Sequence, residues 1–471
     1  MMDGGQATHE RKVHVVIVGG GASGVLMAAH LLGGTSAHLR VTIIERGPML
    51  GCGIAYGTTH PDHLLNTRVA QMSAFPDRSD HFARWLAQNG MGATDQCFVD
   101  RATYGRYLSS LLDPWRSGGE SHRLRCVRGT CTSLRETGGG VVAHLDDGTS
   151  VISDTAILAT GHAVPAEPAA PLRGAWDFSA PTDPEAAVAI IGTGLSMVDH
   201  VVTLLGAGHR GPVLCLSRRG LVPKVHAPSQ PLKLGRQDIP LGASVSAVLH
   251  GLRRLVRAAE AQGGTWRDAV DGIRHHIAAI WRSWDLDQRA RFLRHAAAYW
   301  EVHRHRMPPT SARRIEQAMS DGQLFVLRGK FDRAAVRDDG RIDLLLASRG
   351  TVGVRNIVAD HVIDCRGIRR DPIKDSAPVI RDLLTCGAGR LDPLGLGLDT
   401  TTDAQVIDTY NRPSHRIFAI GPAARGTLWE ITAIPDIREQ TFRLARDVFG
   451  AGAETTVSHS PTADPSERAT Y

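Results

Sequence analysis

The sequence is poor in cysteine and in aromatic residues. Its 471 residues include seven cysteines, and aromatic residues make up only 5% of the chain. No two cysteines form a CxxC pair or the spacing typical of a zinc site, so we predict no metal centre. A chain of this length buries a large core without disulfides, which excludes a disulfide-stapled mini-protein. The odd number of cysteines favours a reduced, cytoplasmic protein.

A long uninterrupted hydrophobic run is also missing. The most apolar stretch, Val13 to Leu32, contains four glycines and two histidines. This pattern is typical of a strand, a turn and a helix rather than of a membrane span. The first residues, Met1 to Lys12, are polar and lack the apolar core of a secretory signal. We therefore expect no membrane partner.

Charge of one sign does not dominate either. Lys and Arg number 54 against 48 Asp and Glu, which gives a net charge of +6. Only five of the basic residues are lysines, so 49 are arginines, whose rigid forks bind carboxylates and phosphates. The basic residues form no long run, so we expect no nucleic-acid partner. Anionic small molecules are the better expectation.

The N-terminal region carries a complete dinucleotide-binding fingerprint. A β-branched run, Val13–Val18, leads into the glycine-rich turn Gly19–Gly24, and a second apolar strand ends at Glu45. The turn allows a pyrophosphate to sit at a helix N-terminus, while an acid at the end of the second strand accepts hydrogen bonds from ribose hydroxyls. The fingerprint has three glycines, Gly19, Gly21 and Gly24, and it places them at the ligand or at the contact between helix and strand.

A second fingerprint follows after residue 180. The strand Ala187–Ile191 precedes Gly192 and Gly194, and Ser196 begins the next helix. The second strand of this unit ends in Arg218 and Arg219 rather than in an acid. Arginine at this place favours a ribose 2′-phosphate, so we predict NADPH, with NADH as the alternative.

Both fingerprint units end alike, and a helical region interrupts the second. Each unit closes with a charged, β-rich stretch and an apolar strand that runs into a glycine, at Gly161 and at Gly367. Between residues 241 and 320 apolar residues recur at helical spacing. The predicted fold class is therefore α/β, with two Rossmann-like dinucleotide-binding domains and a helical insertion in the second.

Six segments of the chain resemble two-dinucleotide-binding-domain flavoproteins of the bacterial FAD/NAD(P)-binding family. They are Gly19–Gly24, Leu50–Gly57, His63–Asn66, Leu158–Gly161, Gly192–Asp199 and Trp429–Arg438. The resemblance implies FAD on the first unit. It divides the FAD-binding domain into a first part, 11–165, and a C-terminal part, 368–449, and the NAD(P)-binding domain into a first part, 180–240, and a second part, 321–367. The helical insertion spans 241–320, and a disordered tail spans 450–471.

The resemblance also implies site residues. It places Ser23 and Glu45 at FAD, and Gly421 and Ile434 near the flavin ring. Related flavoproteins often carry Gly-Asp where this chain has Gly421 and Pro422, so the ribityl contact of that aspartate must come from elsewhere. The weak candidates for a catalytic role, in segments expected to approach the flavin, are Asn66, Arg425, Trp429 and Glu430.

The resemblance extends to flavin monooxygenases of the FAD-dependent urate hydroxylase type and, more distantly, to N-hydroxylating monooxygenases. It implies that NADPH reduces FAD and that molecular oxygen then supplies one atom to a small electron-rich substrate. Urate, converted to 5-hydroxyisourate in purine metabolism, is the leading substrate expectation. The alternatives are N-hydroxylation of an amino acid such as aspartate, an NADPH:acceptor oxidoreductase without oxygen insertion, and a flavin-binding sensor. The oligomeric state is not predicted.

Overall fold

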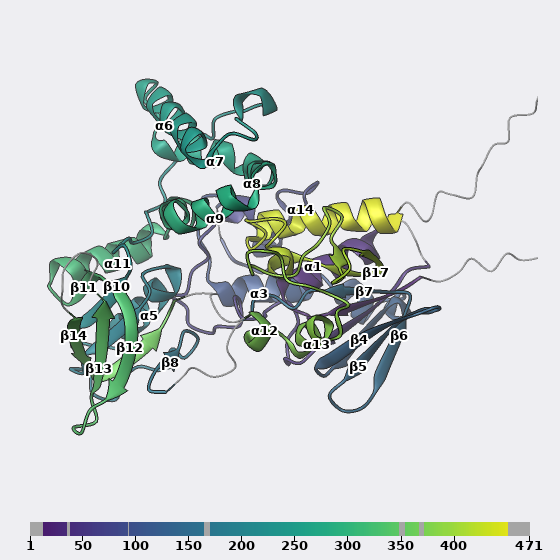
Figure 1. Ribbon diagram of the computed structural model, residues 1–471, viewed down its shortest axis with the longest axis horizontal. Helices are drawn as coiled ribbons and strands as arrows, with labels where there is room; N and C mark the ends of the chain where they lie inside the picture. The colour runs from purple at the N-terminus through teal and green to yellow at the C-terminus, as the bar shows by residue number, and fades with distance from the viewer. Residues whose placement is uncertain are drawn as a thin grey trace, which may run out of the picture.

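The computed structural model describes residues 13–34, 38–92, 94–163, 170–347, 354–366 and 372–450. A mainly parallel sheet and a fully parallel sheet, each with an antiparallel meander beside it, form two units that lie side by side. A group of helices stands above their junction (Figure 1). The predicted α/β class with two Rossmann-like units and a helical insertion is therefore confirmed. Residues 451–471 of the predicted tail (450–471) and the glycine exit at Gly367 lie outside the described residues.

The first unit is built on a six-stranded sheet. β1 pairs in parallel with β2 on one side and with β7 on the other, so the winding of the sheet reverses at β1. Open α/β sheets bind ligands at the carboxyl ends of the strands at this switch point. The strands, in spatial order, are β16 (Gln405–Ile407), β17 (Pro413–Ala419), β7 (Thr155–Leu158), β1 (His14–Val18), β2 (Arg40–Glu45) and β3 (Leu124–Arg128).

Each face of this sheet is covered by a different layer. Helix α1 (Ala22–Gly33) packs with α14 (Ile434–Leu444) on one face, where they share a buried apolar cluster. The other face is covered by a meander and a helix: β4 (Cys131–Thr137), β5 (Gly140–Leu145), β6 (Ser150–Ser153) and α13 (Pro378–Cys386). Helix α14 ends at Leu444, and the chain continues as a wide π-helical turn to Gly450.

The second unit repeats this plan with five parallel strands. β9 lies between β10 and β15, so the winding again reverses at the first strand of the unit. The strands, in spatial order, are β11 (Leu324–Arg328), β10 (Val213–Ser217), β9 (Val188–Ile191), β15 (His361–Asp364) and β8 (Arg173–Gly174). The covering elements are α5 (Leu195–Gly206), α11 (Pro309–Ser320), β12 (Lys330–Val336), β13 (Ile342–Ala347) and β14 (Val354–Ala359).

The helical insertion has its own aromatic core. Trp281, Trp284, Phe292 and Trp300 are each less than a tenth exposed, and Trp429 from the C-terminal segment joins them. The helices are α6 (Val245–Ala261), α7 (Trp266–Ile273), α8 (Ile277–Ser283), α9 (Leu286–His295) and α10 (Ala297–Arg304).

Short helices fill the remaining connections of the first unit: α2 (His81–Gln88), α3 (Arg101–Ser110), α4 (Asp113–Arg116) and α12 (Pro372–Asp375).

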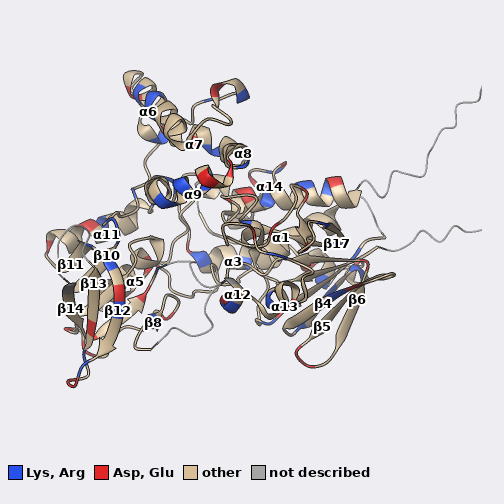
Figure 2. Cartoon of the chain, viewed as in Figure 1, with Lys and Arg blue, Asp and Glu red and all other residues tan. Residues whose placement is uncertain are grey.

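Basic and acidic residues are interspersed over both units and the insertion (Figure 2). Within the described part of the chain, no helix combines the length and the apolar character needed to cross a membrane.

Candidate functional site

The first glycine turn leaves no room for side chains where strand and helix meet. Gly19 has a φ of +105°, and a Cβ there would overlap the carbonyl oxygen of Ala159 at the end of β7. A Cβ on Gly24 would overlap the carbonyl oxygen of Gly19. Gly21 differs, because a Cβ there meets only Gly53, at an ordinary 3.5 Å. The turn thus holds α1 tightly on the sheet and leaves a concave backbone at its N-terminus.

The acid at the end of β2 is fixed beside this turn. Glu45 accepts hydrogen bonds from the amide of Gly20, at 2.6 Å, and from the amide of Gly47, at 2.7 Å. A carboxylate has about four acceptor positions, so roughly two remain for an outside donor. Glu45 is therefore held in place with capacity for ribose hydroxyls, as the fingerprint predicts.

The C-terminal segment closes onto the same turn. Gly421 has a φ of +61°, and a Cβ on it would overlap the hydroxyl of Ser23 in the first turn of α1. The Gly421 amide donates to Oε1 of Gln440 at 2.8 Å. Ile434 begins α14, which lies along α1 (Figure 1). The structure therefore brings Gly421 into contact with Ser23 of the fingerprint, far apart as they are in sequence.

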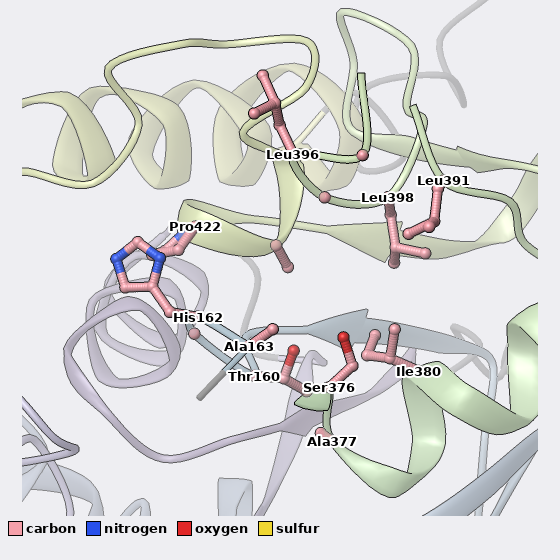
Figure 3. Close-up of a pocket in the computed structure, with 14 residues that line it drawn as sticks. Thr160, His162, Ala163, Ser376, Ala377, Ile380, Leu391, Leu396, Leu398 and Pro422 are labelled. Carbon is pink, nitrogen blue, oxygen red and sulfur yellow. The ribbon is translucent and has the colours of Figure 1, made fainter. Parts of the chain in front are cut away.

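A pocket opens beside the exit of β7. Thr160, Gly161 and His162 form one wall, Pro422 lies close to His162, and Leu396 comes from the loop above (Figure 3). Sequence reasoning missed His162. Burial and the nearby Arg425 charge lower the pKa of His162 to about 3, so its imidazole is neutral at neutral pH. A charge-free side chain therefore lines this wall.

The second glycine turn is more open than the first. A Cβ on Gly192, whose φ is +121°, would overlap the carbonyl oxygen of Cys365. Gly194 precedes α5, and a Cβ there would meet no protein atom within 4 Å. Ser196 lies in the first turn of the same helix. The backbone at Gly194 is accessible to a ligand at the helix N-terminus.

The two arginines after β10 have different surroundings. Arg219 donates to the carbonyl oxygens of Arg294 and His295, at 3.0 and 3.2 Å, and lies over the ring of Tyr299 at 4.9 Å. Its guanidinium is therefore engaged by the helical insertion. Arg218 is exposed at the end of the strand. Arg218 is therefore the more exposed of the two arginines.

Three of the four catalytic candidates lie where the insertion meets the C-terminal segment. Glu430 accepts hydrogen bonds from Nε1 of Trp300, at 2.5 Å, and from Nε of Arg304, at 2.9 Å. Burial opposes ionisation of Glu430, but the combined effects of Arg304, His305, the Trp300 hydrogen bond and Arg274 outweigh it and lower the pKa. Trp429 stacks on Trp281 with ring centroids 5.1 Å apart. Glu430 and Trp429 thus join the insertion to the FAD-side segment.

Arg425 and Asn66 have fewer protein contacts. The Arg425 guanidinium lies over the Trp429 ring at 4.5 Å. Asn66 is half-buried, and its backbone carbonyl accepts a hydrogen bond from Nε2 of His226 at 2.9 Å. The structure therefore groups Arg425, Trp429 and Glu430, and it places Asn66 at a separate contact with the segment that follows β10.

Sequence reasoning also missed the polar junction between the two units. His63 bonds to the hydroxyl of Thr58, at 2.7 Å, and to that of Thr203 on α5, at 2.8 Å. Arg101 pairs with Asp199 at 2.8 Å. Burial raises the pKa of Asp199 to about 6, against the opposing effect of Arg101. No single segment signals this junction, because each partner comes from a different unit.

No group of three or more His, Cys, Asp or Glu side chains suitable for a metal ion occurs among the described residues. All seven cysteines are free thiols.

Comparisons with known proteins agree with this architecture. Residues 16–163 match a family model described as FAD-NAD(P)-binding. No curated protein matches the sequence significantly. Among the solved structures that superpose over nearly the whole chain are three monooxygenases.

The first is the ornithine N-hydroxylase of Kutzneria sp. 744, with a TM-score of 0.61, 14% identity, and coverage of 93% of this chain and 99% of the other. The cadaverine monooxygenase of Erwinia amylovora has a TM-score of 0.62, 11% identity, and coverage of 96% and 99%. The L-lysine 6-monooxygenase of Pseudomonas syringae has a TM-score of 0.62, 15% identity, and coverage of 93% and 99%. At these identities the likeness shows the fold. The predicted resemblance to two-domain FAD/NAD(P)-binding flavoproteins is confirmed.

Proposed function

We propose that the protein is a FAD-dependent, NADPH-consuming monooxygenase that N-hydroxylates a primary amine. The observation that carries this proposal is the complete architecture: two dinucleotide cradles and a helical insertion docked on the C-terminal segment. That architecture superposes on 99% of the ornithine hydroxylase chain. Fold likeness raises the expectation for this chemistry, and the site residues supply the physical support.

The first cradle fits FAD. The concave backbone around Gly19, Gly21 and Gly24 faces a helix N-terminus, which suits the pyrophosphate. Glu45 retains acceptor capacity for ribose hydroxyls. The flavin end would lie toward Gly161, Ser23, Gly421 and Ile434, which the fold gathers at the carboxyl edge of β7 and β17. Bound FAD supplies hydride acceptance and oxygen activation.

The second cradle fits NADPH. Gly192 permits the tight turn, and the open backbone at Gly194 and Ser196 offers amides to the pyrophosphate. Arg218 would pair with the 2′-phosphate, while Arg219 would hold the insertion against the nucleotide-binding unit.

The junction of insertion and C-terminal segment is the proposed substrate side. Trp429 and Trp281 exclude water there, and the buried pair of Glu430 with Arg304 fixes the segment that carries Arg425. His162 is neutral and therefore places no second positive charge beside Arg425. A direct role in catalysis stays a proposal for Arg425 and Asn66, whereas Trp429 and Glu430 act as positioning residues.

Urate hydroxylation receives less support than N-hydroxylation. The three compared structures are described as ornithine, cadaverine and lysine monooxygenases, so the comparisons favour the alternative over the leading substrate expectation. An NADPH:acceptor oxidoreductase remains the second candidate because the same two cradles would serve it.

The test measures NADPH absorbance and oxygen uptake of the FAD-loaded protein with aspartate, ornithine, lysine, cadaverine and urate. We expect an amine to raise both rates together, with a hydroxylamine formed and little peroxide. Equal rates with and without every amine, with all oxygen recovered as peroxide, would contradict the proposal and favour a reductase.

A further inference from the structure

One guanidinium group at the proposed substrate side, that of Arg425, has only a long ion pair with Glu301 and no hydrogen bond to the described residues. Arg425 makes no side-chain hydrogen bond to any residue that the structure describes, and its Nε is fully buried. Its side chain is only 18% exposed. Arginine keeps its charge in proteins and carries five N–H donors. A largely buried cation of this kind is costly unless an acceptor reaches it.

Two neighbouring arginines each have a carboxylate within hydrogen-bond distance, although Nη2 of Arg304 is also buried without a partner. Arg304 pairs with Glu430 at 2.9 Å, and Arg274 pairs with Asp436 at 2.9 Å. The carboxylate closest to Arg425 belongs to Glu301, and the distance from its Oε1 to Nη2 is 3.7 Å, beyond hydrogen-bond length.

Glu301 is also shared. It lies 3.5 Å from Nε2 of His305, and its own side chain is 42% exposed. It therefore does not saturate the guanidinium of Arg425. The remaining donors of Arg425 are available to an acceptor that is not part of the described protein.

The position of Arg425 indicates where such an acceptor would bind. Arg425 directly follows the turn Gly421–Ala424, whose first residue contacts Ser23 at the first cradle. It is close enough to His162 for its charge to lower the pKa of that imidazole. The Trp429 ring at 4.5 Å orients the guanidinium plane. Arg425 thus lies between the FAD side and the helical insertion.

We propose that Arg425 binds the carboxylate of the substrate, so that the amine to be hydroxylated belongs to an amino acid and not to a simple diamine. The planar fork of arginine matches a carboxylate bidentately, and a bound carboxylate replaces the missing protein acceptor. Trp429 and the Glu430–Arg304 pair hold the fork in place. This inference rests on the proposed N-hydroxylase function and names its substrate class.

The test compares ligands that differ in the carboxylate alone. Lysine and cadaverine form such a pair, and aspartate and ornithine extend the set. Binding to the oxidised, FAD-loaded protein is measured by calorimetry without NADPH, so that no turnover is needed. We expect saturable binding of at least one amino acid and, for the lysine–cadaverine pair, weaker binding of the diamine.

Two substitutions at Arg425 and one distant control separate the explanations. Arg425→Gln should weaken amino-acid binding about 30- to 100-fold and leave cadaverine binding unchanged, because only the charged hydrogen bonds to the carboxylate are lost. Arg425→Lys should fall between wild type and Gln. The control, Arg210→Gln, removes an exposed ion pair with Glu185 in the other unit and should leave binding unchanged. Anaerobic reduction of the flavin by NADPH should stay within about twofold in the Arg210→Gln control.

Three results would overturn the inference. The first is equal binding of lysine and cadaverine, or no saturable binding of any of the four ligands. The second is unchanged amino-acid binding by Arg425→Gln. The third is loss of FAD affinity in Arg425→Gln with ligand selectivity intact, which would make Arg425 a flavin contact. Failure of the proposed function is a separate outcome: flavin reduction and ligand binding persist, but no amine couples oxygen uptake to hydroxylamine formation.

Discussion

Substitution of Gly194 separates cofactor binding from folding. A Cβ at this position meets no protein atom within 4 Å, and the backbone, with φ −86° and ψ −165°, is one that alanine adopts readily. Gly194→Ala should therefore change the free energy of unfolding by no more than about 1 kcal/mol. The added methyl group projects into the space proposed for the NADPH pyrophosphate.

The expected loss of NADPH affinity follows from the amides at this turn. Displacing the pyrophosphate from two charged hydrogen bonds costs about 2 to 4 kcal/mol, which corresponds to roughly 30- to 1,000-fold in Kd. The assay is anaerobic flavin reduction against NADPH concentration in a stopped-flow instrument, with thermal unfolding in parallel. Gly192→Ala is the matched control, because its Cβ would overlap the Cys365 carbonyl and should lower stability instead. Wild-type NADPH dependence in a well-folded Gly194→Ala protein would refute the reasoning.

Four other substitutions test the remaining parts of the account. Gly21→Ala, whose Cβ makes only an ordinary 3.5 Å contact, should leave apoprotein stability within about 1 kcal/mol but abolish FAD retention, measured by flavin content after gel filtration. Arg218→Ser should lower the preference for NADPH over NADH about 10- to 100-fold in flavin-reduction assays, whereas Arg219→Ser should leave that preference unchanged. Burial lowers the pKa of His30 to about 4, so its neutral form stabilises the fold above pH 6.5, and this contribution is lost as the pH falls toward 4. At roughly 1.4 kcal/mol per pKa unit, the free energy of unfolding falls by about 3 kcal/mol. In His30→Gln, the free energy of unfolding measured with denaturant should depend less on pH over this range. An unchanged pH dependence would contradict this prediction.

Local sequence patterns were sufficient to predict the two dinucleotide-binding units. The glycine turns and Glu45 lie within short segments whose spacing reflects backbone geometry, so their physical role can be inferred without a partner. The helical insertion was equally readable, because its apolar residues recur at a period that only a helix explains. The end of α14 was less predictable, since the transition to a π-helical turn at Ala445 depends on tertiary packing against α1.

Contacts between distant segments could not be predicted in this way. Glu430 was singled out as a weak catalytic candidate, but its pairing with Arg304 and Trp300 depends on how the insertion docks. His162 carried no sequence signal, because its lowered pKa arises from burial and from a charge more than 250 positions away. The division of roles between Arg218 and Arg219 likewise follows from contacts of Arg219 with helix α9.

The most direct test of the central claim is the fate of molecular oxygen. The FAD-loaded protein would be supplied with NADPH, isotopically heavy oxygen gas and the amino acid that binds most tightly, and the product would be examined by mass spectrometry. The account predicts one heavy oxygen atom in a hydroxylamine, formed in equal amount to the NADPH consumed. Unmodified amino acid, with all the heavy oxygen recovered as hydrogen peroxide, would contradict it.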